Sequence, residues 1–310
     1  MKYFITGGAG FVGSSLIDAL APNNAVTVYD NLSSGKKEFI APHLKKKNFK
    51  FIKGDVLDVK FLNQSIKGHD LVFHLASNPD ISLSVKNPRL DLDQGIIATF
   101  NVLEAMRTNG IKKISYNSGS GVYGDQGLTY TAEDFGPLLP TSMYGASKLA
   151  AEALISAFCY IYDMQAWILR PANLVGRRQT HGVGFDFIKK LKANPKELLI
   201  LGDGQQSKSY LYIDDFISAM LLIMNKAKEK INVFNVASDN FIDVTSIAKI
   251  TAQAMGLKGV NFKYTGGQGG WKGDVPKVRI DAKKLKKLGW SPKLTSKKAI
   301  ERSIQDLLKK

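Results

Sequence analysis

The 310-residue sequence contains a single cysteine, Cys159. One thiol excludes an intrachain disulfide and is typical of a protein kept in a reducing compartment. Hydrophobic residues make up 44% of the chain, which is ordinary for a globular protein and enough for one large or two modest domains.

The chain also lacks any run of about 18 apolar residues, so no membrane span is predicted. Met1 is followed almost at once by the apolar stretch KYFIT, with no charged leader or signal-like stretch before it. Together with the single thiol, this predicts a cytoplasmic protein with no membrane partner.

Acidic residues are scarce relative to basic ones, because 27 Asp and Glu stand against 43 Lys and Arg, a formal net charge of +16. Such a charge can indicate a nucleic-acid partner. Here the basic residues form short clusters with no interleaved aromatic side chains, unlike a groove that binds single strands. We therefore expect a solvated basic surface and no nucleic-acid partner; mild steering of anionic substrates is the alternative.

The first 170 residues alternate short apolar stretches with amphipathic ones. Strands are predicted at 2–6, 25–29, 49–53, 71–75, 111–117 and 165–170, and helices at 11–20, 88–109 and 142–162. This alternation predicts an α/β fold, a Rossmann-type doubly wound parallel sheet. We expect an NAD-binding domain at 1–171 and a smaller α/β substrate domain at 172–310, with a strand near 232–236 returning to the first.

The segment TGGAGFVG places Gly7, Gly10 and Gly13 between the first predicted strand and helix, and Asp30 ends the second strand. Such glycines permit a tight turn, close approach of a pyrophosphate and helix packing, while the helix N-terminus favours phosphate. A carboxylate at position 30 suits the ribose hydroxyls and repels a 2′-phosphate, so NAD is predicted rather than NADP. A tight turn without a ligand is the alternative.

Tyr144 and Lys148 are four residues apart in YGASKLAAEAL, so they share one helix face. A nearby ammonium and an oxidised nicotinamide favour the phenolate, which can then take a proton from a substrate hydroxyl. A purely structural helix pair is the alternative. His74 is expected to be a packed, hydrogen-bonded histidine, and no metal site is predicted.

The residues predicted to bind the cofactor are Gly7, Gly10, Phe11, Val12, Asp30, Asn31, Ser33, Gly35, Asp55, Val56, Leu75, Ala76, Ser77, Asn117, Tyr144, Lys148 and Pro171.

The motifs TGGAGFVGS, YDNLSSG, GDVLD, VYGD, PTSMYGASK, LRPANLVG, LGDGQQSKSYLYIDD and GWKGDVP occur in this order along the chain. In this the chain resembles the extended short-chain dehydrogenases/reductases, specifically nucleotide-sugar epimerases of the UDP-glucose 4-epimerase type. The resemblance implies redox roles for Tyr144 and Lys148 and a UDP-sugar substrate. It also implies a homodimer through helices 88–109 and 142–162, whose apolar residues could equally be core. The substrate contacts that it implies are Asn173, Lys208, Tyr210 and Asp274.

The chain departs from that family at two polar positions. Gly119 stands where a Ser or Thr usually bonds the sugar oxygen, and Gly95 stands where an Asn is common. The candidates to replace the missing hydroxyl are Ser118, Ser120, Ser142 or a water, and Ser120 is grouped with Tyr144 and Lys148 as catalytic. Members of that family also commonly have an arginine near the GWKGD segment, and no such arginine is evident in this chain.

The residues directly before VYG are Ser120 and Gly121, which are not the acids of the related dehydratases and decarboxylases. The sequence therefore predicts an NAD-dependent epimerase that interconverts UDP-glucose and UDP-galactose, or related UDP-hexoses, by transient oxidation at C4. The alternatives are an oxidoreductase on another nucleotide sugar and a weakly active binding relative. The sequence does not distinguish UDP from dTDP as the nucleotide of the substrate.

Overall fold

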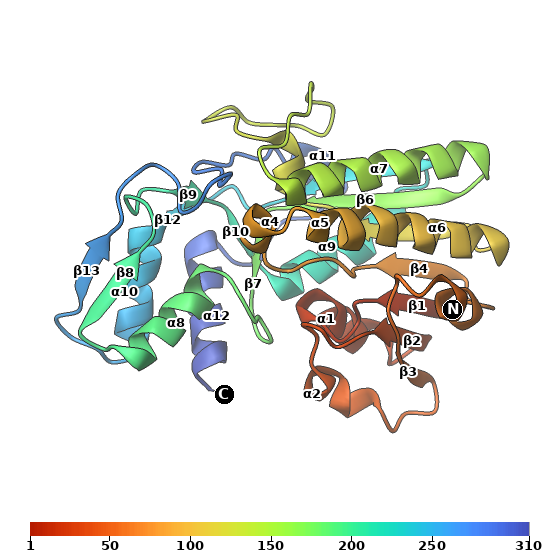
Figure 1. Ribbon diagram of the computed structural model, residues 1–310, viewed down its shortest axis with the longest axis horizontal. Helices are drawn as coiled ribbons and strands as arrows, with labels where there is room; N and C mark the ends of the chain where they lie inside the picture. Colours follow the sequence, from red (N-terminus) through yellow and green to blue (C-terminus); the bar gives the residue numbers. More distant parts are fainter. Residues whose placement is uncertain (310) are drawn as a thin grey trace.

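A seven-stranded, fully parallel sheet forms the centre of the molecule (Figure 1). The computed structural model describes residues 1–309. The strand order is β11-β6-β5-β4-β1-β2-β3. The strands are β1 (Lys2–Thr6), β2 (Ala25–Asp30), β3 (Phe49–Lys53), β4 (Leu71–His74), β5 (Lys113–Asn117), β6 (Gln165–Pro171) and β11 (Ile231–Val236). The doubly wound sheet predicted from the sequence is therefore confirmed.

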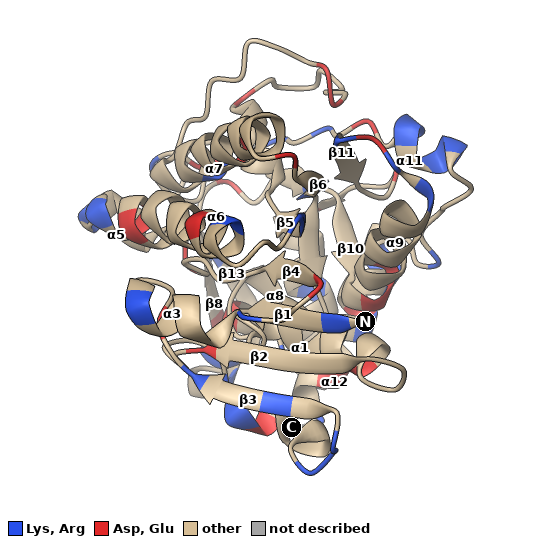
Figure 2. Ribbon diagram, turned by 90° about the vertical axis from the view of Figure 1, so that its right-hand side faces the viewer, with Lys and Arg blue, Asp and Glu red and all other residues tan. Residues whose placement is uncertain are grey.

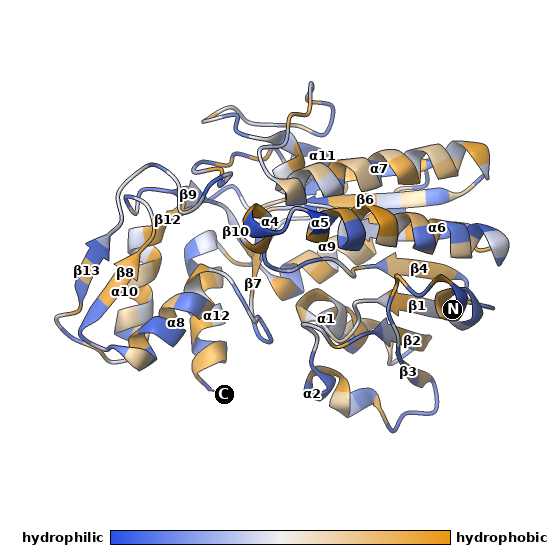
Figure 3. Cartoon of the chain, in the orientation of Figure 1, coloured by the Kyte–Doolittle hydropathy of each residue, from blue (hydrophilic) through white to orange (hydrophobic). Residues whose placement is uncertain are grey.

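Both faces of the sheet are buried because successive side chains point to opposite faces. In β1, Phe4 packs in one core cluster and its neighbour Ile5 in the other. In β6, Ile168 and Leu169 divide in the same way. This explains why the strands read as nearly continuous apolar runs, as the orange β1 and β4 show in Figure 3.

Helices cover the two faces in two groups (Figure 2). The group packed around Phe4 comprises α3 (Val59–Ser65), α6 (Ala98–Thr108) and α7 (Met143–Ile161). The opposite face carries α1 (Phe11–Leu20) and α9 (Ile213–Lys226), which contact each other. No helix within residues 1–309 is long and apolar enough to cross a membrane.

The predicted strand bounds need small corrections. The fourth strand ends at His74 rather than Leu75, and the fifth begins at Lys113 rather than Ile111. Asp30 belongs to β2 itself. The strand predicted at 232–236 is β11, and it pairs with β6 at the edge of the sheet.

The remainder of the chain builds a smaller group of elements beside the carboxyl edge of the sheet. Three helices, α8 (Val183–Ala193), α10 (Val244–Ala254) and α12 (Ser296–Leu308), pack against one another. The short strands are β7 (Asn173–Val175), β8 (Glu197–Ile200), β9 (Ser207–Lys208), β10 (Tyr210–Tyr212), β12 (Ile242–Asp243) and β13 (Asn261–Tyr264). The other short helices outside the cleft are α2 (Lys37–Ile40), η1 (Ala41–His43) and α11 (Lys283–Lys287).

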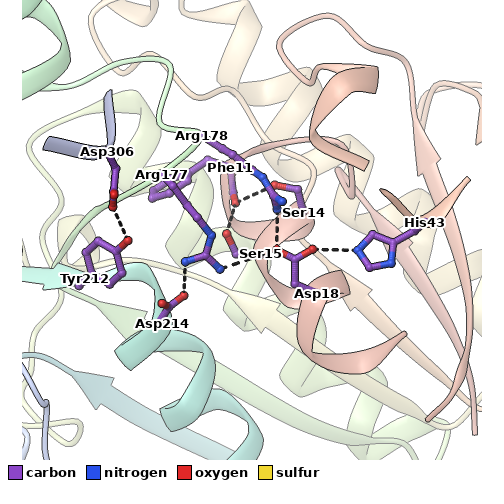
Figure 4. A network of polar contacts seen from close by, with 10 residues as sticks. All are labelled: Phe11, Ser14, Ser15, Asp18, His43, Arg177, Arg178, Tyr212, Asp214 and Asp306. Carbon is purple, nitrogen blue, oxygen red and sulfur yellow. Dashed lines mark hydrogen bonds and ion pairs between the residues drawn. The ribbon is translucent and has the colours of Figure 1, made fainter. Parts of the chain in front are cut away.

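A network of charged residues connects the loop after β7 to the helix α1 (Figure 4). Asp18 of α1 accepts from His43 Nε2 and from Arg178 Nη1, both at 2.8 Å. Arg177 lies beside them and pairs with Asp214 at the start of α9, with 2.5 Å between the nitrogen and the oxygen. These contacts join the residues that follow the glycine turn to the loop that leads into α8.

The helix predicted at 88–109 is not a uniform α-helix. It runs as α5 (Arg89–Asp91), a π-helical segment η2 (Leu92–Ile97) and then α6. The π segment contains Gly95, and a Cβ added there would lie 2.6 Å from the Cβ and Oγ of Ser147 in α7. Glycine at position 95 is therefore required by the close approach of α7, and π segments of this kind recur at functional sites.

We expect Gly95→Ala to lower the free energy of unfolding by about 1–3 kcal/mol, because the new methyl group overpacks the contact with α7. Ser147→Gly removes both obstructing atoms, so the double variant should recover stability relative to the sum of the single changes. Urea unfolding of the four proteins measures this coupling, and strictly additive effects would contradict the proposed contact.

Candidate active site

A cleft of about 660 Å³ lies between the carboxyl edge of the sheet and the smaller group of elements. Its floor lies at the point where the strand order reverses between β1 and β4. In open parallel sheets this switch point is where ligands bind, because the loops on its two sides diverge there. The volume is in the range of small-molecule and cofactor sites.

The glycine turn between β1 and α1 forms one wall of the cleft. Gly7 has φ +67°, and a Cβ there would lie 2.7 Å from the backbone nitrogen of Ala76. Phe11 and Val12 line the cleft at the start of α1, whose first amides have no partner within the helix. The turn thus presents backbone donors and a positive helix end to a phosphate.

Asp30 lies in the same cleft, at the end of β2. Its carboxylate accepts hydrogen bonds from the backbone amides of Ala9 at 2.9 Å and Leu32 at 2.8 Å. Burial raises the pKa of Asp30, whereas these two bonds lower it. Each oxygen keeps a second acceptor site for the hydroxyl of a ribose.

Most of the predicted cofactor residues line the cleft. Those on its wall are Gly7, Gly10, Phe11, Val12, Asp30, Asn31, Ser33, Asp55, Val56, Leu75, Ala76, Ser77, Asn117, Tyr144 and Pro171. Gly35 instead packs beneath Asp30, where a Cβ would lie 2.9 Å from a carboxylate oxygen. Lys148 also lies behind the wall, since it is 3% exposed and covered by Tyr144.

These residues fit a nicotinamide dinucleotide. The Oδ1 atom of Asn117 is buried at the cleft and has no hydrogen-bond partner within residues 1–309. A buried polar atom without a partner is costly, so a bound donor at this point is expected to satisfy it.

Tyr144 and Lys148 lie on one face of α7, as their spacing predicts. The Lys148 ammonium is 5.4 Å from the Tyr144 ring and 5.0 Å from the Tyr116 ring, and it donates to the carbonyl of Asn117 at 2.9 Å. Burial lowers the pKa of Lys148 to about 8, although the carboxylates of Asp91 and Glu152 raise it.

The phenol of Tyr144 is harder to ionise than an ordinary tyrosine side chain. Burial, and then the charge of Asp91, raise the pKa of Tyr144 to about 12. The expected effect of Lys148 does not dominate, because the ammonium lies behind the ring and is bonded to Asn117. A further positive charge on the cleft side of the phenol is therefore needed to bring its pKa toward neutrality.

The three serines considered as replacements for the missing hydroxyl have different surroundings. Ser118 is buried and donates to Glu152 at 2.5 Å, while the Ser142 hydroxyl caps α7 by accepting from the amide of Gly145. Ser120, at the start of η3 (Ser120–Tyr123), lines the cleft, and its hydroxyl has no partner among the described residues. Ser142 also lines the cleft, and Ser120 is the one of the three whose hydroxyl makes no hydrogen bond within residues 1–309.

His74 is a packed residue, as predicted. Its Nδ1 accepts from the Thr6 hydroxyl at 2.8 Å, and its Nε2 donates to the Thr99 hydroxyl at 3.0 Å; Thr99 itself donates to a carbonyl. Burial, reinforced by Lys148, lowers the pKa of His74 to about 3, so the ring is neutral.

The four predicted substrate contacts gather at the other end of the cleft. Asn173, Lys208, Tyr210 and Asp274 all line it. Lys208 pairs with Asp274 at 2.7 Å and lies 5.5 Å from the Trp271 ring. The Lys208–Asp274 ion pair and the Trp271 ring therefore form one group of charged and aromatic side chains at this end of the cleft.

Several residues of the cleft were not identified from the sequence. They include Asn78, Asp80, Gln94, His181, Asp186 and Gln206. The Oε1 atom of Gln206 is buried without a partner within the described chain. Only the LGDGQQSKSYLYIDD motif, which contains Gln206, offered a signal for any of them.

Comparisons with known proteins show the family to which the chain belongs. The model of the NAD dependent epimerase/dehydratase family matches residues 3–237, and the chain belongs to this family of extended short-chain dehydrogenases/reductases. It is similar to the UDP-glucose 4-epimerase of Mycolicibacterium smegmatis, with 29% identity over 98% of each chain. The cofactor of the protein is NAD.

Two solved structures are similar along their whole length. One is the UDP-glucose 4-epimerase of Thermotoga maritima with UDP-glucose, with a TM-score of 0.88, 32% identity and coverage of 100% of this chain and 99% of that chain. The other is the UDP-glucose 4-epimerase of Thermus thermophilus in complex with NAD, with a TM-score of 0.88, 28% identity and 99% coverage of both chains.

Proposed function

We propose that the protein is an NAD-dependent epimerase that interconverts UDP-glucose and UDP-galactose, or related UDP-hexoses, by transient oxidation at C4. The observation that carries the proposal is one continuous cleft with three parts. A dinucleotide cradle lies at one end, Tyr144 lies at the centre, and Lys208 with Trp271 lies at the other end.

The residues of the glycine turn and Asp30 are proposed to bind the pyrophosphate and the adenosine ribose of NAD. The turn at Gly7 and Gly10 binds the pyrophosphate, and Asp30 accepts from the adenosine ribose. When bound, NAD accepts a hydride from the sugar carbinol and returns it. We also propose a division into an NAD-binding domain at 1–171, to which β11 returns by pairing with β6, and a substrate domain at 172–310.

Tyr144 is proposed as the base that removes the proton of the 4-hydroxyl and later returns it. Lys148 stabilises the phenolate from behind and orders the strand end at Asn117. Ser120 offers a hydroxyl to the sugar oxygen in place of the residue missing at Gly119. No carboxylic acid occupies positions 118–121, so the proton transfers of a dehydratase lack their usual acid and base.

Extraction of nucleotide from the purified protein, followed by incubation with UDP-galactose without added NAD, tests the proposal. We expect bound NAD and formation of UDP-glucose. Tyr144→Phe should lower turnover by about 10²–10⁴-fold, because it removes the general base, and leave bound NAD unchanged. Turnover that requires added NAD and accumulates NADH would indicate the oxidoreductase instead, and full turnover by Tyr144→Phe would exclude Tyr144 as the base.

A second test concerns Gly119, whose backbone is extended and whose Cβ position has no atom within 4 Å. Gly119→Ser is therefore expected to fold and bind NAD normally. Its turnover should equal or exceed that of the parent, with a gain limited to about 10²–10³-fold, the usual contribution of one such donor. Lower turnover in the same assay would mean that another group or the sugar itself already fills this space.

We also propose that the protein is a cytoplasmic homodimer that associates through α6 and α7. The support is the apolar surface on this side, where Ile97, Phe100 and Ile161 are all more than 40% exposed. Light scattering of the intact protein should give twice the chain mass of 34.0 kDa. A monomer mass, or a dimer that survives Phe100→Glu unchanged, would contradict this interface.

A further inference from the structure

Asp91 is a buried carboxylate outside the predicted site. It ends α5, directly before the π segment, and is 1% exposed. One carboxylate oxygen accepts from the Asn78 amide at 3.0 Å, and the other accepts from the Ser84 hydroxyl. Because an unpaired buried carboxylate is very costly, these two donors fix its position.

The two donors belong to the loop and the short helix that follow β4, and the loop forms part of the cleft. Residues 77–84, here called the wall segment, follow β4, and 77–82 line the cleft. Asn78 also exchanges hydrogen bonds with the backbone of Asp80, at 2.9 and 3.0 Å, and Asp80 accepts from Ser82. The wall segment is therefore internally ordered, and its bonds to Asp91 join it to the helix behind it.

The helix α5, which ends at Asp91, lies against α7, which carries Tyr144 and Lys148. Both α5 and α4 (Leu83–Lys86), which continues the wall segment, pack on α7. The ionisable groups near the phenol of Tyr144 are Asp91 of α5, Lys148 of α7 and Tyr116 of β5. Burial is the largest cause that raises the pKa of Tyr144, and the charge of Asp91 is the next largest. Burial lowers the pKa of Lys148, and the charges of Asp91 and Glu152 partly offset this effect.

We propose that Asp91 is a positioning residue of this site: it fixes the wall segment beside Tyr144 and supplies a negative charge to the Tyr144–Lys148 pair. The proposal rests on the roles of Tyr144 and Lys148 in the proposed function. It assigns two measurable effects to one side chain, one on substrate binding through the wall segment and one on the pH dependence of turnover.

Asp91→Asn tests both effects, because it keeps the shape and removes the charge. Loss of a negative charge favours the phenolate of Tyr144 and disfavours the ammonium of Lys148. Both limbs of the profile of kcat against pH should therefore move to lower pH, by about one unit. The KM for UDP-galactose should rise, and bound NAD should stay unchanged.

The matched control is Asp93→Asn, two residues along the same chain segment. Asp93 pairs with exposed Arg89, and its own side chain is 31% exposed. This variant should leave the pH profile and KM unchanged. An unmoved profile in Asp91→Asn, or an equal shift in both variants, would overturn the proposal.

A titration without sugar separates this proposal from the proposed function. With saturating NAD, the ultraviolet difference spectrum between the protein and its Tyr144→Phe variant reports ionisation of this phenol alone. The midpoint should be lower in Asp91→Asn than in the parent even if no UDP-sugar is turned over. An unchanged midpoint would overturn the role of the Asp91 charge.

Ser84→Ala provides a second variant should Asp91→Asn fail to fold. It removes one hydrogen bond to Asp91 and keeps the negative charge of Asp91. Ser84 belongs to the wall segment but does not itself line the cleft. KM should rise while the pH profile stays in place. An unchanged KM, or a shifted profile, would overturn the positioning role.

Discussion

The hydrogen bond from Lys148 to the carbonyl of Asn117, 2.9 Å long, is the constraint on which the site depends. It fixes α7 across the carboxyl end of β5. One turn further along α7, Glu152 forms an ion pair with Arg170 of β6, with 2.6 Å between the closest atoms, and accepts from Ser118. These buried contacts hold Tyr144 in the wall of the cleft, at the carboxyl ends of β5 and β6.

A buried charge is costly unless other groups pair with it. Lys148 and Arg170 are both buried, and each has several such partners. Lys148 lies between two aromatic rings and near the carboxylates of Asp91 and Glu152. Arg170 is also bonded to the Tyr123 hydroxyl at 3.0 Å. This packing raises the pKa of the Tyr144 phenol, so the positive charge of an oxidised nicotinamide has a clear physical task, which is to favour the phenolate.

Much of the fold and the cradle could be predicted because their signals are local. The glycine spacing, Asp30 at a strand end and the spacing of Tyr144 and Lys148 each depend on one element and its periodicity. The π segment at Gly95, the burial of Lys148 behind the cleft wall and the role of Asp91 could not be predicted. Each depends on contacts between separate elements, such as Gly95 against Ser147, Lys148 against Asn117 and Asp91 against Asn78, and no periodicity encodes such contacts.

In the proposed reaction, hydrogen leaves C4 of the sugar and returns to the same carbon within one cleft. The most direct measurement uses UDP-galactose carrying deuterium at C4, incubated with the protein in ordinary water. We expect UDP-glucose that retains deuterium at C4. Loss of the label to solvent would contradict it, because it would require exchange of a proton at this carbon rather than return of the abstracted hydride.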